Sequence, residues 1–494
     1  MSKAVGIRHK VGCFLICAGA VLGAEATKAI CRIVVAVAVV TVVSGSAVAR
    51  VVTWPAAEGT VATDGEYRVS VDGRPVDVVF IPKPSMHDEQ LTGDENLQPY
   101  YATFFDADEE VQVVVESPKD LSSVRILPSR LGISPSIDSK HRVSFRAKPP
   151  FKLSFEPRPR HRALVFSAHL PERDVPSPNA PGVRYFAAGR HHFDRPIELK
   201  SNETMYLAPG AWVEAAVWAS GTNMVVCGRG VLSGQCWDWR KGPAGQMMLV
   251  TGSDVTVRDL TVVGSWHWSV ALHGCDRALV EGVSILNGRV LNDDGIDVCN
   301  CRNALIRNVF VRSQDDCIAV KDAMEGVRVE NAILWTDVAN SLRIGYECRG
   351  VPLRFTDFQA KGVDIIHLSV QKPPRGVENA VCIQASNGMI FEKMLFEDFR
   401  FDGMEIGDNI AKIQTLKIED QWQRHESAGY VRAVTFRDFS FPGGLFRQGS
   451  LVRLESYDDA HTVEGVSFEG FDPSIEFWTW GQVKYVRENK GHKH

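Results

Sequence analysis

Residues 292–321 read NDDGIDVCNCRNALIRNVFVRSQDDCIAVK, and this stretch decides the fold. Two aspartate pairs, Asp293–Asp294 and Asp315–Asp316, stand 21–22 residues apart and enclose a segment in which apolar and polar side chains alternate. A repeat of about 20 residues is the length of one winding of a β-solenoid. Residues one winding apart stack at the spacing between strands, about 4.8 Å. The spacing therefore predicts that several carboxylates meet on one outer face.

An eight-residue template recurs around this stretch: apolar, any, apolar, polar, small or polar, apolar, any, apolar. Two strands that meet at a two-residue corner would produce it, because the alternation slips once at the bend. No segment has a capped 3.6-residue apolar stripe. One coil cannot bury its own apolar face, so the repeats predict an all-β fold, a parallel β-helix. The copies start 23, 26 and 23 residues apart, at Val255–Val262, Ala278–Ile285, Ala304–Val311 and Val327–Leu334.

The region before the repeats predicts a small β-sandwich-like domain. Tyr67–Val71 and Val76–Phe80 alternate around Asp72–Gly73, which indicates a hairpin. A proline-rich stretch at 171–178 is typical of a linker. The predicted division is a leader over 1–49, a β-sandwich-like domain over 50–170 and a parallel β-helix catalytic domain over 183–494.

The amino terminus has the order of a secretory signal peptide. Lys28 and Arg32 precede the apolar run Ile33–Val43, and Ala47–Ala49 supplies a small-residue cleavage site. The run is too short to span a bilayer comfortably, so no stable membrane insertion is expected. We expect a secreted or periplasmic protein, with a membrane-anchored amino terminus as the alternative.

The composition of the 494 residues, 45% hydrophobic and 23% charged, is that of a globular protein. The net charge of -5 shows no excess of basic residues, which argues against nucleic acid as a partner. Four of the eight cysteines beyond the leader lie in apolar strand-like runs, where buried free thiols are common, so we predict no disulfides. No pair has zinc-finger spacing, so we predict no metal site, and we expect no cofactor. The oligomeric state cannot be read from the sequence.

The clustered aspartates suit the hydrolysis of a glycosidic bond. Inversion needs a protonated carboxyl for the leaving oxygen and a carboxylate that activates water on the opposite face. Asp294, Asp315 and Asp316 could supply both, because crowding like charges raises at least one pKa. The alternatives are solvated aspartates at corners of the solenoid and a calcium site, since hard cations also bind carboxylate clusters.

These motifs resemble those of polygalacturonase-like glycoside hydrolases, namely glycoside hydrolase family 28 and its clan relatives, including the dextranase and isopullulanase family. The resemblance implies a right-handed parallel β-helix and inverting hydrolysis of a carbohydrate substrate. By position, Asp294 matches the first catalytic aspartate, Asp315 the general acid, and Asp316 a partner of Asp294 in water activation. The segments that carry the resemblance are Tyr206–Ala211, Gly228–Gly234, Trp266–Ser269, Asn292–Asp297 and Gln314–Lys321.

Two departures from the family pattern concern the substrate. Where polygalacturonases carry G-H-G, this chain has Ala339–Gly345, without histidine, and their R-I-K corresponds to Cys382–Gln384, without cations. A neutral, α-linked glycan is therefore expected in place of a galacturonide. Aromatic side chains usually hold uncharged sugars, and Trp266, Trp268 and Trp335 are the candidates.

Further residues near the aspartate pairs are expected to bind the substrate. Arg343 and Glu347 could bind sugar hydroxyls or orient the acid, and the plainer interpretation is a surface ion pair. Lys321 could hold a carboxylate ionised or contact the sugar. His267 lies near the preceding winding, although a lone histidine is more often structural. The complete set of expected substrate-binding residues is Lys321, Arg343, Glu347, His267, Trp266 and Asn292.

Two other functions fit the same scaffold, because a fold does not fix a function. A polysaccharide lyase would release unsaturated products that absorb in the ultraviolet. A non-catalytic glycan-binding solenoid would release no reducing ends, and mutation of its aspartates would leave sugar binding intact.

Overall fold

The described part of the chain is built almost entirely from β-strands. The computed structural model describes residues 50–83, 85, 98–349, 354–368, 379–403, 409–420, 423–442, 444 and 451–489. The leader predicted over 1–49 lies outside these residues. Within them the one helical element is the 3₁₀ turn η2 (Ser129–Leu131). No helix in these ranges is long and apolar enough to cross a bilayer. The prediction of an all-β fold is confirmed.

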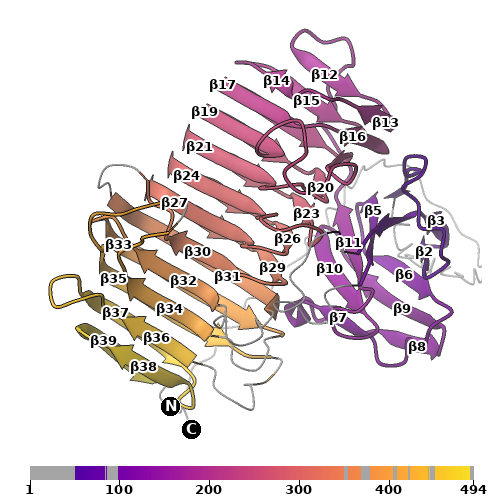
Figure 1. The fold of residues 1–494 in the computed structure, drawn as a ribbon. Helices are drawn as coiled ribbons and strands as arrows, with labels where there is room; N and C mark the ends of the chain where they lie inside the picture. Colours follow the sequence, from indigo (N-terminus) through magenta and orange to yellow (C-terminus); the bar gives the residue numbers. More distant parts are fainter. Residues whose placement is uncertain are drawn as a thin grey trace, which may run out of the picture. The chain divides into compact units, whose positions relative to one another are not determined.

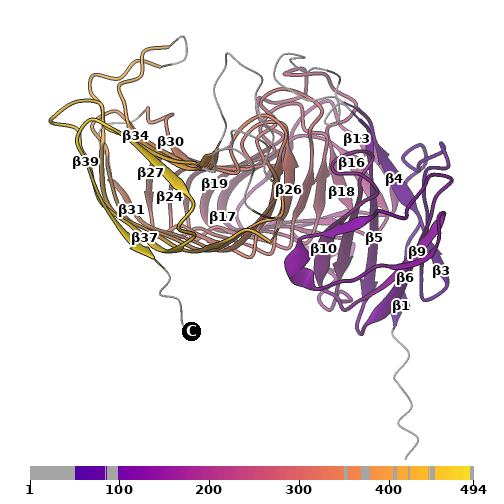
Figure 2. The same cartoon turned by 90° about the horizontal axis from the view of Figure 1, so that it is seen from below.

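The first part of the chain forms two sheets that share one apolar core (Figure 2). Phe105, Leu153 and Phe166 of the first sheet and Val113 and Phe145 of the second lie in this core. The first sheet contains β1 (Val51–Val52), β4 (Val78–Ile81), β5 (Tyr100–Ala107), β7 (Arg125–Leu127), β10 (Phe151–Glu156) and β11 (Leu164–His169). The second contains β2 (Arg68–Val71), β3 (Arg74–Val76), β6 (Val111–Glu116), β8 (Ser136–Ser139) and β9 (Arg142–Ala147).

The predicted hairpin forms, but its second strand is shorter than expected. β2 and β3 pair antiparallel around Asp72 and Gly73, whose φ angles of 45° and 76° suit a primed two-residue turn. The chain then leaves this sheet at Asp77, and β4 pairs with β5 of the other sheet. The predicted strand Val76–Phe80 is therefore wrong as a single element, because it is shared between two sheets.

The described residues from Val183 onward wind into parallel strands, of which 28 are assigned in them (Figure 1). In the middle, β24, β25 and β26 pair with β27, β28 and β29 of the next winding, which is the pairing of a parallel β-helix. From β31 onward one long strand covers two of these positions, since β31 pairs with both β28 and β29. The handedness and the domain boundaries stay predictions, and residues Val48–His494 form one compact unit.

The bounds of the winding strands are β12 (Val183–Phe186), β13 (Gly189–His192), β14 (Ile197–Leu199), β15 (Thr204–Leu207), β16 (Ala211–Glu214), β17 (Val217–Gly228), β18 (Val231–Ser233), β19 (Met248–Arg258), β20 (Thr261–Val263), β21 (Val270–Asp276), β22 (Leu279–Glu281), β23 (Ser284–Leu286), β24 (Ile296–Arg302), β25 (Leu305–Arg307), β26 (Phe310–Ser313), β27 (Ile318–Glu325), β28 (Arg328–Glu330), β29 (Ile333–Thr336), β30 (Leu342–Gly345), β31 (Arg354–Leu368), β32 (Asn379–Ala385), β33 (Ile390–Phe401), β34 (Asn409–Thr415), β35 (Tyr430–Ser440), β36 (Leu451–Glu455), β37 (Val463–Phe471), β38 (Glu476–Trp480) and β39 (Val483–Asn489).

The corner predicted within each template copy has one physical cause. Its second residue adopts a left-handed conformation, with φ of 68° at Asp259, 66° at Gly282, 55° at Asn308 and 52° at Asn331. Glycine, asparagine and aspartate tolerate this region better than other residues do. The turn reverses the alternation, so the apolar residues on both sides of the corner face inward.

Side chains of successive windings stack in columns inside the coil. Val270, Ile296, Ile318 and Leu342 follow one another in register, and all are buried. Full burial of such a side chain contributes about 1.5–3 kcal/mol relative to exposure. This column fixes the register of one face, and the candidate site lies at the start of that face.

The first sheet packs on another face of the coil. A shared apolar cluster contains Tyr100 and Val165 of the first sheet together with Trp212, Phe310 and Trp335 of the coil. The Tyr100 hydroxyl also donates a hydrogen bond of 2.6 Å to the carbonyl oxygen of Asn287. This contact supports the loop that leads to the aspartate pairs.

Candidate functional site

Three carboxylates from two windings meet immediately before paired strands. Asp294 precedes β24, whereas Asp315 and Asp316 precede β27. Ile296 pairs with Ile318, and the Gly295 N–H donates to the carbonyl oxygen of Asp316 at 2.9 Å. One carboxylate oxygen from each of the three aspartates lies within 4.8 Å of the others. The structure therefore brings the three predicted catalytic side chains together.

Gly295 allows the two windings to approach this closely. A Cβ atom at this position would lie 2.4 Å from the carbonyl oxygen of Cys317, a distance that real side chains do not adopt. Any larger residue would push apart the strand starts that carry Asp294 and Asp316. The glycine in the N-D-D-G-I-D motif thus has a packing role.

Asp293 supports the site from beneath. It is fully buried, and its Oδ2 accepts hydrogen bonds from the N–H groups of Gly288 and Arg289 at 2.8 and 3.2 Å. Its Oδ1 accepts from the N–H groups of Gln314 and Asp315 at 2.6 and 3.3 Å. The side chain joins the loops of two windings and holds the backbone of Asp315 in place.

The pKa values of Asp294 and Asp315 are shifted in the same direction. Burial raises the pKa of Asp315 well above its usual value, and the carboxylates of Asp294 and Asp316 raise it further. Burial likewise raises the pKa of Asp294, although the Lys321 ammonium opposes the shift. Asp315 is half-buried, whereas Asp294 and Asp316 are each 3% exposed. The cluster therefore tends to retain a proton, and Asp315 is its most accessible member.

Lys321 is the cation at the centre of the site. Its Nζ lies 3.3 Å from Asp294, 2.8 Å from Asp297 and 2.9 Å from Glu347. Burial lowers the pKa of Lys321, but these three carboxylates outweigh burial and raise it well above its usual value. The ammonium also lies 3.8 Å from the centre of the Trp268 ring. Lys321 thus stays charged and positions Asp294.

Asp297 lies on the outer face, as its alternation with Ile296 and Val298 predicts, but it is fully buried. Burial raises its pKa to about 7, and Lys321 opposes the shift. Asp297 therefore belongs to the lysine network and is not a free surface residue.

A column of asparagines ends on Asp316. Both the backbone N–H and the side-chain amide of Asn340 donate to Asp316 Oδ1, at 2.9 and 2.8 Å. Asn379 donates to Asn340 Oδ1 at 2.9 Å, and Asn409 donates to Asn379 Oδ1 at 2.8 Å. All four side chains are at most 4% exposed. Because every donor points toward Asp316, the chain of amides stabilises negative charge there.

The sequence held a signal for this column that was missed. Asp294, Asp316, Asn340, Asn379 and Asn409 each stand two residues before an inward apolar residue of the same face, in successive windings. Asn340 occupies the segment in which the absence of histidine was noted. The recurrence of an amide or acid side chain two residues before the inward apolar residue of each winding would have indicated the column.

Most of the predicted substrate-binding residues surround the carboxylates. Asn292 Nδ2 lies 3.4 Å from Asp315 Oδ2, and Arg343 Nη1 lies 3.6 Å from Asp316 Oδ2. Glu347 contacts Lys321, which outweighs burial and lowers the pKa of Glu347. His267 is half-buried, and burial, with Arg240 and Lys321, lowers its pKa to about 4, so its ring is neutral at pH 7.

Trp266, by contrast, is not available to a sugar. Its side chain is fully buried in the coil core, and its Nε1 donates to the carbonyl oxygen of Ala244 at 2.8 Å. The prediction that Trp266 binds substrate is therefore wrong in this structure. Trp335, the other candidate, is also fully buried. Trp268 is half-buried, and its ring lies beside the Lys321 ammonium.

A cavity of about 590 Å³ lies elsewhere. It opens between the amino-terminal sheets and the coil, beside Lys152, His169 and Arg229. None of the three clustered aspartates lines it. The candidate site is therefore located by the chemistry of its carboxylates and not by this cavity.

Comparison with known proteins supports the relation suggested by the motifs. Residues 195–337 match the sequence model for glycosyl hydrolases family 28. A probable polygalacturonase of Vitis vinifera is 28% identical over 130 residues, which cover 24% of this chain and 26% of that protein. A polygalacturonase of Cryptomeria japonica is 23% identical over 181 residues, or 31% and 35% of the two chains. The chain thus matches about a quarter to a third of the length of these relatives.

Among solved structures, Dex49A from Penicillium minioluteum shares the fold. It aligns with a TM-score of 0.57 and 14% sequence identity, and the alignment covers 84% of this chain and 90% of that one. The predicted resemblance to polygalacturonase-like glycoside hydrolases is confirmed.

Proposed function

We propose that this chain, a polygalacturonase-like member of the group around glycoside hydrolase family 28, hydrolyses glycosidic bonds of a polysaccharide or oligosaccharide with inversion. The observation that carries the proposal is the meeting of Asp294, Asp315 and Asp316 within 4.8 Å on one face. Their surroundings differ, and different surroundings give chemically similar carboxyl groups different roles.

Asp315 is the general acid of the proposed reaction. It is the most exposed of the three, and burial together with Asp294 and Asp316 raises its pKa, which favours the protonated form that an acid needs. Asp315 donates this proton to the leaving glycosidic oxygen as the bond to the anomeric carbon breaks. A carboxyl group in this role supplies about 10²–10⁴-fold of rate.

Asp294 and Asp316 activate the water. Asp294 Oδ1 is buried and has no hydrogen-bond partner among the described residues, so a water can donate to it. Asp316 Oδ1 accepts two hydrogen bonds from Asn340, and Arg343 lies 3.6 Å from Oδ2. The water attacks the anomeric carbon and gives its proton to these carboxylates. The proton then returns to Asp315 through solvent for the next cycle.

Inversion rests on the resemblance. Carboxyl groups in inverting enzymes stand about 6.5–9.5 Å apart and in retaining enzymes about 5–5.5 Å apart. The 4.8 Å here is an upper limit between oxygens of a three-membered cluster, not a separation between two carboxyl centres. The anomer first released, measured by proton NMR, decides between the two outcomes.

A neutral glycan is the proposed substrate. Lys321 is buried among three carboxylates, and the strand beside Arg343 places Cys382 and Gln384 on the outer face. Arg343 itself donates to Gln384 at 3.0 Å. Trp268 provides the aromatic surface on which an uncharged sugar can stack.

One observation favours a uronate substrate instead. Arg343, Cys382 and Lys412 follow one another in register, so two cations flank Cys382 on neighbouring strands. A carboxylate on the sugar could lie between them. Hydrolysis of polygalacturonate but not of uncharged glycans would favour this second candidate.

The test is a screen of the mature protein against uncharged α-glucans, plant and algal glycans and polygalacturonate. New reducing ends without ultraviolet absorption indicate hydrolysis, whereas unsaturated products indicate a lyase. Binding without any product would refute catalysis and favour a glycan-binding solenoid. Export belongs to the same proposal, and the amino-terminal residue of the protein recovered outside the cytoplasm tests the cleavage after Ala49.

A further inference from the structure

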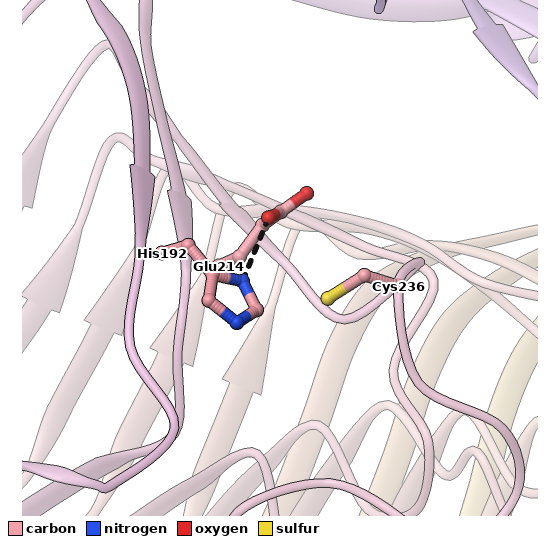
Figure 3. A group of neighbouring side chains, drawn as sticks. All are labelled: His192, Glu214 and Cys236. Carbon is pink, nitrogen blue, oxygen red and sulfur yellow. Dashed lines mark hydrogen bonds and ion pairs between the residues drawn. The ribbon is translucent and has the colours of Figure 1, made fainter.

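A second group of potential ligands lies at the amino-terminal end of the coil. His192 ends β13, Glu214 ends β16, and Cys236 follows β18, so each residue comes from a different winding. His192 and Glu214 are register partners, and Glu214 is in turn paired with Ser233, three residues before Cys236. Figure 3 shows the Cys236 sulfur directed toward the His192 ring and Glu214. One donor atom from each residue lies within 4.8 Å of the others.

The distances suit a small metal ion. His192 Nδ1 lies 3.0 Å from Glu214 Oε2. Metal–ligand bonds of about 2.0–2.2 Å at tetrahedral angles place nitrogen and oxygen ligands roughly 3.3–3.5 Å apart. The two atoms need to separate by only a few tenths of an ångström to admit the ion. Cys236 is the one exposed cysteine among those described, so its sulfur is accessible.

Neighbouring groups already orient the donors. His192 Nε2 lies 3.0 Å from Asp194 Oδ1, the arrangement in which a carboxylate holds the second ring nitrogen of a metal-binding histidine. Trp237 stacks on the His192 ring with centroids 5.4 Å apart. Arg190 donates two hydrogen bonds to Glu214 Oε1, which leaves Oε2 to face the histidine.

We propose that His192, Glu214 and Cys236 form a zinc site, with a water molecule as the fourth ligand. Imidazole, thiolate and carboxylate are the ligands that zinc takes, whereas calcium and magnesium prefer oxygen alone. With zinc bound, the deprotonated thiol and Glu214 balance the two positive charges of the ion, and Arg190 and Asp194 balance each other. The sequence did not predict this site, because the ligands come from separate windings and not from a short motif.

The ion would join three windings at the end of the coil. The first winding has a neighbour on one side only, so its strands lack half of the hydrogen bonds that inner strands make. A bond network through zinc ties His192 to the second and third windings. This role is independent of the glycosidase reaction, since the aspartate cluster does not include these residues.

The test measures zinc binding to the full mature chain. Protein dialysed against a chelator is titrated with zinc, and stoichiometry is determined by native mass spectrometry and elemental analysis. The variants are Cys236→Ser, His192→Gln and Asp194→Asn, with His191→Gln as the matched control, because His191 contacts the carbonyl oxygen of Ala187 instead. Cobalt is the spectroscopic probe, since a thiolate ligand gives a charge-transfer band in the near ultraviolet.

We expect one zinc per chain in the wild type and in His191→Gln, with a higher melting temperature when zinc is present. Asp194→Asn should bind about 10–100-fold more weakly. Cys236→Ser and His192→Gln should lose more than that, and Cys236→Ser should lose the cobalt–thiolate band. A wild type that binds no zinc, or a Cys236→Ser variant that binds as tightly as the wild type, overturns the proposal. Circular dichroism of each variant separates loss of the site from loss of the fold.

Discussion

Asp315→Asn should abolish most of the activity and preserve the fold. Asparagine keeps the Oδ1 atom that accepts the Asp316 N–H at 2.9 Å, and the amide of Asn292 can turn to meet the new Nδ2. The backbone of residue 315 remains tied to Asp293. The substitution removes one of three crowded carboxyl groups, so the melting temperature should stay the same or rise. The variant retains shape and loses the transferable proton.

The expected loss in kcat is about 10²–10⁴-fold, the usual contribution of a general acid. At 1.36 kcal/mol for each factor of ten, this equals about 2.7–5.4 kcal/mol of transition-state stabilisation. The loss should shrink on an aryl glycoside, whose phenolate leaves without protonation. Reducing-sugar release from the natural substrate and phenol release from the aryl glycoside supply the two rates.

The matched control is Asp322→Asn, which changes an aspartate on β27 outside the cluster. Asp322 Oδ1 accepts the Arg349 N–H at 2.7 Å, and asparagine can do the same. Its kcat should stay within about twofold of the wild type. Full activity of Asp315→Asn on the natural substrate, or an equal loss on both substrates, would contradict the role of Asp315 as the acid.

Three further predictions address the surroundings of the cluster. Lys321→Met leaves Asp294 and Asp297 without their ammonium partner and should lower the free energy of unfolding by about 3–5 kcal/mol in urea titrations. The loss should be smaller at pH 5 than at pH 8, because the two carboxyl groups can take up protons at the lower pH. No loss at either pH would contradict the network. Arg343 lowers the pKa of Asp315, so Arg343→Gln should raise that pKa. Activity needs protonated Asp315 and falls as pH rises through its pKa, so the alkaline limb of the kcat/KM profile should move to higher pH. A shift of this limb to lower pH would be inconsistent with Asp315 as the acid. Trp268→Ala should raise KM about 2–12-fold, because about 0.5–1.5 kcal/mol of stacking is lost. Trp266→Ala should instead lower the free energy of unfolding by about 3–5 kcal/mol. Equal effects of the two substitutions on KM would contradict the assignment of Trp268.

The fold was predictable from the sequence because a coil repeats its constraints. Each winding must turn at the same places, so residues such as Asn308 and Asn331 recur at corners that need a positive φ. The distance between Asp294 and Asp315 along the chain then equals one winding, and their meeting follows from the pairing of β24 with β27. Local pattern and global pairing agree here, which is why the pattern was informative.

The burial of individual side chains was less predictable, because loops decide it. Trp266 and Trp268 are two residues apart and looked equivalent. The loop after β18 covers Trp266: a Cβ atom at Gly242 would lie 2.1 Å from its ring. The sequence of such a loop has no repeat from which its path could be predicted. The same holds for Cys236, which that loop brings to His192 and Glu214.

The column that ends on Asp316 explains why the site lies at these two windings. Carboxylates stacked at about 4.8 Å repel one another, so acids cannot fill a long column. Amides both donate and accept, and Asn340, Asn379 and Asn409 continue the column without charge. The column changes from amides to acids between Asn340 and Asp316, and Lys321 and Arg343 stand at that boundary. The buried side chain of Asp316 is thus supported by hydrogen bonds that run through three windings. Asn409, two windings beyond Asn340, donates the outermost hydrogen bond of this column, so a substitution there removes that bond without touching the site.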